Sequence, residues 1–167
     1  NVYYEDDFVT TSTDGGQTGT VGIVYSEKGW ETDGTSGGNT ANTDNSHGEW
    51  VEDDSPANDG TYSDGTAHKG SAGATASFTF TGTGVDIYSR TDMTTGTVVA
   101  CLDSEPYVSQ DDAAISKTYF VDNYSNDGEA YYQIPTVTFG DLPYGTYKVT
   151  LYVTSAAGQN RSTYYLD

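Results

Sequence analysis

Apolar and polar residues alternate along several short segments, and the clearest of these lie within residues 74–103. In the stretch ATASFTF at 74–80, every second residue is apolar, which is the pattern of a strand with one buried face. The alternation returns at 85–87 and at 97–102, after turns rich in Gly and Thr. The pattern predicts three consecutive strands, which we expect to pair in sequence order as an antiparallel meander.

Further strands are predicted later in the chain. Residues 119–121 and 132–139 resume the alternation, with Pro135 marking an edge strand or a bulge. Residues 147–153 alternate most regularly, and we expect their partner to be 162–167. The residues predicted to face inward are Phe78, Phe80, Val85, Ile87, Val98, Ala100, Leu102, Val149, Leu151 and Val153.

These segments predict an all-β fold, an antiparallel β-sandwich with at most a turn or two of helix. A chain of 167 residues is long enough for one domain with a real core, so we expect a single domain over 1–167. A Gly/Thr-rich loop is expected at 11–20, followed by a short strand near 22–25. Residues 1–10 are expected to form a first strand whose middle carries carboxylates.

A long insertion at about 31–61 interrupts the pattern, because it is almost devoid of aliphatic residues and rich in Asp, Gly and Asn. It is predicted to be a loop outside the core, of a length that is usually functional or mobile. Its one anchor is Trp50 with its neighbour Val51. The indole of Trp50 either pins the loop onto the sandwich or forms a platform for a sugar ring, and we favour the first alternative.

Charge narrows the classes of partner. The chain has 25 acidic and 6 basic residues, a formal net charge of -19. A phosphate backbone would be repelled, so nucleic acid is excluded as a partner and anionic membranes are disfavoured. No apolar run reaches the roughly 20 residues that a membrane-spanning helix needs, so membrane insertion is not expected. Because no signal peptide is visible at Asn1, we expect a mature product or an excised domain, located outside the cell.

Several strings occur in an order that resembles a known family. They are GIVYS at 22–26, FTFTGTGV at 78–85, YGTYKV at 144–149 and YYLD at 164–167. Together they resemble galactose-binding-like jelly-roll modules, which are usually appended to secreted carbohydrate-active enzymes and surface proteins. The resemblance implies a jelly-roll sandwich and a secreted or surface-attached bacterial protein. The insertion at 31–61 departs from the family pattern.

The same resemblance implies a structural calcium ion. Related jelly rolls often hold calcium between acids on the first strand and an Asp on the last, which here would be Glu5 or Asp7 with Asp167. The alternative for Glu5 and Asp7 is a solvated edge strand protected by charge. The stretch from Asn123 superficially resembles a calcium-binding loop, but its twelfth position is Ile134 and not Glu, so a hairpin turn is preferred.

Catalytic signatures are missing from the sequence. There is no G-x-S-x-G, no H-E-x-x-H and no phosphate-binding loop, and 25 acids cannot be reduced to one catalytic pair by spacing. Cys101 is predicted to be a buried free thiol. His47 and His68 are too few and too distant in sequence to indicate a metal site, and His68 is expected to pack at a strand entrance. We therefore expect no enzymatic activity.

Aromatic residues in the predicted loops favour a glycan-binding function, since sugar C–H faces stack on Tyr and Trp. The candidate ligand-binding residues are Trp30, Trp50, Tyr107, Tyr124 and Arg161. The arginine would bond sugar hydroxyls or a sialic acid carboxylate. The expected partner is a glycan or a host glycoprotein, and the isolated domain is expected to be a monomer. The alternative is a structural spacer or an adhesin module that contacts a host protein.

Overall fold

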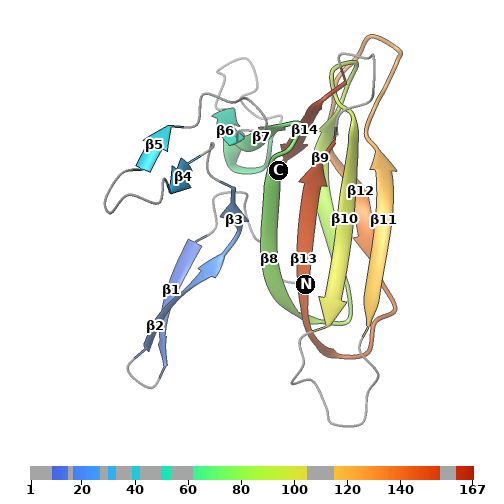
Figure 1. Ribbon diagram of the computed structural model, residues 1–167. Coiled ribbons are helices and arrows are strands. Elements are labelled where there is room, and N and C mark those ends of the chain that lie inside the picture. The colour runs from blue at the N-terminus through green and yellow to red at the C-terminus, as the bar shows by residue number, and fades with distance from the viewer. Residues whose placement is uncertain are drawn as a thin grey trace.

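The computed structural model describes residues 9–14, 17–26, 30–32, 39–41, 50–53, 62–104, 115–154 and 161–167. This part of the chain forms two five-stranded antiparallel sheets packed face to face (Figure 1). The all-β sandwich predicted from the sequence is thereby confirmed. Its one helical segment among the described residues is the 3₁₀ turn η2, Ser63–Gly65. No described helix is long and apolar enough to cross a membrane.

We call the two sheets the front sheet and the back sheet. The front sheet has the order β11 (Ser116–Asp122), β10 (Thr97–Ser104), β13 (Gly145–Val153), β8 (Thr75–Gly82) and β3 (Val24–Tyr25). The back sheet has the order β12 (Tyr131–Phe139), β9 (Val85–Thr91), β14 (Thr163–Leu166), β7 (Ala67–Ser71) and β6 (Trp50–Asp53). Two hairpins complete the described strands, β1 (Val9–Asp14) with β2 (Gln17–Gly22) and β4 (Trp30–Thr32) with β5 (Asn39–Ala41).

The core lies between the two sheets. Eight of the ten residues predicted to face inward are buried, and Phe78 and Val85 are partly buried against the same cluster, so this prediction is confirmed. The inward residues of β13 are completely or almost completely removed from solvent, with Val149 and Leu151 at 0% exposure. Fully burying an aliphatic side chain of this size stabilises the fold by about 1.5–3 kcal/mol, which explains why the alternation is strictest in this strand.

The predicted pairing of the strands is wrong in two places. β8, β9 and β10 do not form a meander, because β8 and β10 both pair with β13 while β9 lies in the back sheet beside β12 and β14. The strand β13 does not pair with β14, which instead pairs with β7 and β9. Period-two patterning fixes which side chains are buried, and successive strands that cross to the opposite sheet satisfy it equally well.

The first part of the chain also differs from the prediction. The loop expected at 11–20 is largely the β1–β2 hairpin, and the segment 31–61 contains β5, β6 and most of β4. β6 joins the edge of the back sheet by pairing with β7, so part of the insertion belongs to the sandwich. Pro135 lies on edge strand β12 beside a register shift, as predicted. The first eight residues lie outside the described part of the chain.

Candidate functional site

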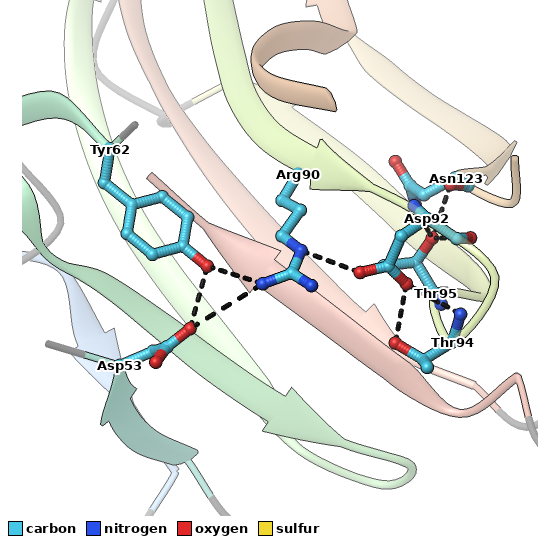
Figure 2. A network of polar contacts seen from close by, with 7 residues as sticks. All are labelled: Asp53, Tyr62, Arg90, Asp92, Thr94, Thr95 and Asn123. Carbon is cyan, nitrogen blue, oxygen red and sulfur yellow. Dashed lines mark hydrogen bonds and ion pairs between the residues drawn. The ribbon is translucent and has the colours of Figure 1, made fainter. Parts of the chain in front are cut away.

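A single arginine on the outer face of the back sheet connects elements that are distant in sequence. Ile87 and Ser89 of β9 point into the core, so Arg90 points outward. Its Nε donates to Asp92 Oδ2 at 2.7 Å, and its Nη1 donates to the hydroxyl of Tyr62 at 3.2 Å. Tyr62 in turn donates to Asp53 Oδ2 at 2.8 Å. Figure 2 shows this arginine network bridging β6, the segment before β7, and β9.

Two aromatic rings cover the same guanidinium. Arg90 Cζ lies 4.6 Å from the ring centroid of Tyr165 and 5.2 Å from that of Tyr132, distances typical of cation–π contacts. Tyr132 comes from an irregular part of β12, where one extra residue is inserted between the partners of Thr91 and Ser89. The following residue, Gln133, has φ of 52°, which is uncommon outside glycine. This bulge accommodates the extra residue beside Arg90.

Asp92 holds the turn that follows β9. Its Oδ1 accepts hydrogen bonds from the backbone N–H of Thr94 at 2.6 Å and of Thr95 at 3.2 Å, and a third from the Thr94 hydroxyl at 2.6 Å. Burial by itself would raise the pKa of Asp92, but the Thr94 hydrogen bonds and the adjacent Arg90 outweigh it and lower that pKa. The carboxylate is therefore ionised at neutral pH and fixes the turn.

This turn is joined to two other connections at the same end of the sandwich. The Thr95 hydroxyl donates to the carbonyl oxygen of Asn123 at 2.5 Å, and Asn123 N donates to Gly96 O at 3.1 Å. Gly96 N donates to Thr163 O at 3.0 Å, which brings in the segment before β14. Three connections are thus bonded through buried backbone groups, and the side chains beside them are held in place.

Tyr124 and Arg161 meet at this end. Arg161 Cζ lies 3.3 Å from the ring centroid of Tyr124. At that separation the guanidinium must lie parallel to the ring, because a tilt would drive a nitrogen atom into it. A stacked guanidinium keeps its N–H donors directed outward in its own plane. Among the described residues Arg161 forms no ion pair, so these donors face no carboxylate of the described chain.

An acceptor lies beside this pair. Asp122 Oδ1 accepts the backbone N–H of Tyr124 at 3.0 Å, and the side chain of Asp122 is exposed. We call Asp122, Tyr124 and Arg161 the loop-end site. It combines an aromatic ring, charge-assisted donors and a carboxylate acceptor, all on connections anchored by the arginine network.

Trp50 occupies a different place in the fold. Its Nε1 donates to Thr75 O at 2.8 Å, and its ring packs edge-on against Tyr25 and Tyr164, with centroids 5.0 and 6.4 Å away. A Cβ on Gly70 would approach the indole to 2.9 Å, so that glycine leaves room for the ring. Trp50 therefore pins β6 onto the core, which is the arrangement that we favoured for it over a sugar platform.

The other predicted residues are not brought to the loop-end site. Trp30 begins β4, while Tyr107, Glu5 and Asp7 lie outside the described residues. Asp167 follows β14, and its Oδ1 accepts the backbone N–H of Ser63 at 2.7 Å. Within the described residues there is no group of three or more His, Cys, Asp or Glu side chains placed to hold a metal ion.

Two further residues have surroundings that the sequence did not indicate. Cys101 is half-buried on the outer face of the front sheet rather than buried, because its neighbours Ala100 and Leu102 take the inward positions. His68 lies in β7, where its ring stacks on Tyr25 with centroids 4.0 Å apart. Both residues have structural surroundings that account for them.

Sequence reasoning missed Arg90, Asp92, Tyr62 and Asp122. A signal was present for the first two, because residues two apart in a strand share a face, so the order Arg-Thr-Asp at 90–92 predicts a cation and an acid side by side. Tyr62 and Asp53 reach Arg90 only through the packing of β6 and β7, which no local pattern encodes.

Comparison with known proteins adds the class of fold and no name. The chain is an antiparallel β-sandwich protein with a polar loop-end site. No protein-family model matches it, and no curated protein matches it. Among solved structures it is similar to the enzymatically active domain of tailspike protein 4 from bacteriophage CBA120, with 13% identity and a TM-score of 0.41. The match covers 87% of this chain and 18% of that one.

Proposed function

We propose that the chain is a non-catalytic carbohydrate-binding module, a galactose-binding-like jelly roll of a secreted or surface-attached bacterial protein. The observation that carries the proposal is the stack of Arg161 on Tyr124 at 3.3 Å, at the end of a rigid β-sandwich. Loops at one end of a sandwich commonly carry recognition residues, because the strand faces are committed to packing. A stacked arginine is already ordered, so ligand binding immobilises less of it.

The chemistry of the loop-end site favours an uncharged sugar. Sugar hydroxyls both donate and accept, so one can accept from Arg161 while another donates to Asp122. A ligand carboxylate would meet Arg161 favourably but would be repelled by Asp122 and by the net charge of -19. Of the two ligand groups considered for Arg161, sugar hydroxyls therefore fit better than a sialic acid carboxylate.

The test is a glycan array followed by calorimetry on Arg161→Ala. We expect a coherent set of neutral glycans with a Kd between about 1 µM and 1 mM, as a shallow site implies. Arg161→Ala should raise the Kd at least about tenfold, since hydrogen bonds to charged groups contribute about 1.5–3 kcal/mol. The melting temperature should change little, because Arg161 has no ion pair among the described residues.

Tyr144→Ala is the matched control for that experiment. Tyr144 is 75% exposed in the turn before β13, so its loss should leave both the Kd and the melting temperature unchanged. An array without any glycan hit would overturn the proposal and favour the spacer or adhesin function. Arg161→Ala that binds like the wild type would show that the glycan site lies elsewhere.

We further propose that calcium stabilises the fold through Glu5 or Asp7 together with Asp167. A cation that binds only the native state raises its stability by RT ln(1 + [L]/Kd). Saturating calcium should therefore raise the melting temperature above that measured with a chelator, and Asp167→Asn should remove the difference. The same melting curve under both conditions would contradict this proposal.

A further inference from the structure

The outer face of the front sheet carries an exposed apolar row. Val99 of β10 lies opposite Phe120 of β11 on one side and opposite Tyr152 of β13 on the other, so the three side chains stand side by side across three strands. Phe120 is 77% exposed and Tyr152 is 44% exposed. With neighbouring strands about 4.8 Å apart, the two aromatic side chains are separated by about 10 Å. We call Phe120, Val99 and Tyr152 the aromatic row.

Hydrogen-bonding side chains border the aromatic row. On one side Cys101 lies opposite Thr118 and Thr150, which places two hydroxyls in the next row. On the other side Asp122 lies opposite Thr97. Neither bordering row contains a basic side chain, so nothing here attracts a polyanion. An apolar strip between hydroxyl and carboxylate groups matches a sugar chain, whose rings have apolar faces and hydroxylated edges.

The aromatic row is continuous with the loop-end site. Phe120 and Asp122 are two residues apart on β11 and therefore point to the same side, about 7 Å from each other. Asp122 in turn contacts Tyr124, the ring on which Arg161 stacks. A monosaccharide at the loop-end site would leave Phe120 and Tyr152 uncovered, whereas an extended chain would cover both parts.

We propose that the ligand is an extended, uncharged polysaccharide chain, which engages the loop-end site with one segment and stacks further sugar rings on Phe120 and Tyr152. This inference rests on the proposed function and specifies its ligand class. The charge of the protein supports an uncharged occupant, because a net charge of -19 opposes both an anionic polymer and a second copy of the chain. The aromatic row adds contact area for inner sugar rings and leaves the recognition of a single sugar to the loop-end site.

The first experiment measures affinity against chain length. Calorimetry is run with neutral oligosaccharides of one to six sugars, taken from β-glucan, xylan, mannan and chitin series. We expect the Kd to fall at least tenfold between the shortest and the longest ligand of the series that binds. Phe120→Ala and Tyr152→Ala should abolish that gain and leave the Kd for the shortest ligand within twofold of the wild type.

Matched variants separate stacking from folding. Phe120→Trp keeps an aromatic surface and should retain the gain with chain length, while Tyr144→Ala removes a comparably exposed aromatic ring and should not alter it. Arg161→Ala should weaken every length. Because Phe120 is 77% exposed, its replacement by alanine should leave the urea midpoint unchanged.

Three results would overturn the inference. If Phe120→Ala and Tyr152→Ala bind every length like the wild type while Arg161→Ala fails, the proposed function stands and the extended ligand does not. If no oligosaccharide and none of the four polymers in a pull-down is bound, both fail. If sedimentation shows a wild-type dimer that Phe120→Ala dissociates, and the variant retains the gain with chain length, the row is a contact between copies.

Discussion

Replacing Gly96 by alanine is expected to destabilise the protein by about 3 kcal/mol. A Cβ at this buried position would overlap the carbonyl oxygen of Arg161 and lie 2.8 Å from its carbonyl carbon. Gly96 cannot move away freely, because its N–H donates to Thr163 and its carbonyl accepts the N–H of Asn123. Forcing an extra carbon into a packed site costs about 1–3 kcal/mol, and contact with backbone on both sides places this variant at the upper end.

Urea unfolding of Gly96→Ala and the wild type would measure the loss. Gly140→Ala is the matched control, because a Cβ at Gly140 meets no atom within 4 Å and should change stability by no more than about 0.5 kcal/mol. The Arg161 segment must shift to relieve the overlap, so Gly96→Ala should also weaken glycan binding. A change in unfolding free energy below about 1 kcal/mol would show that the three connections adjust easily.

Replacing Arg90 by alanine is expected to cost about 3 kcal/mol. The substitution leaves Asp92, whose side chain is only 9% exposed, without its cation, and it uncovers the rings of Tyr132 and Tyr165. Removing one partner of a buried pair typically costs 3–5 kcal/mol. The lower end applies because the Arg90 side chain is itself 19% exposed. Lys148→Ala, at an exposed position of β13, is the control and should be nearly neutral.

A double-mutant cycle with Asp92→Ala would isolate the pair, with an expected coupling of about 1–2 kcal/mol at neutral pH. The pKa of Asp92 is lowered in the folded protein, so its contribution is present above the unfolded value of about 3.9. That contribution is lost as the pH falls through the folded pKa, so the coupling should decrease below about pH 4. A coupling that does not change on acidification would contradict the assignment of this pair.

The sequence predicts the sandwich because burial on one face of a strand leaves a local record. Phe78, Phe80 and the alternate residues of β13 carry that record, and the structure places them against the core as expected. Pairing leaves no such record. Nothing local distinguishes a β8 that pairs with β9 from one that pairs with β13, since both arrangements bury the same side chains.

The loop-end site shows the same limit. Tyr124 and Arg161 were each identifiable from residue type and loop position, but their contact depends on backbone bonds from Asn123 and Thr163 to Gly96. Those bonds join segments far apart in sequence. Trp50 was identifiable as an anchor because an indole in a polar stretch has few other ways to avoid solvent, and it packs accordingly.

The positions of β13 and β14 have a consequence for how fast the protein folds. Each is the middle strand of its sheet, and each follows in sequence the strands that it joins. Neither sheet can therefore grow by adding one hairpin after another, since β8 and β10 meet only through β13, and β7 and β9 only through β14. Large loops must close before the central pairings form, which is the topology of domains that fold in milliseconds to seconds.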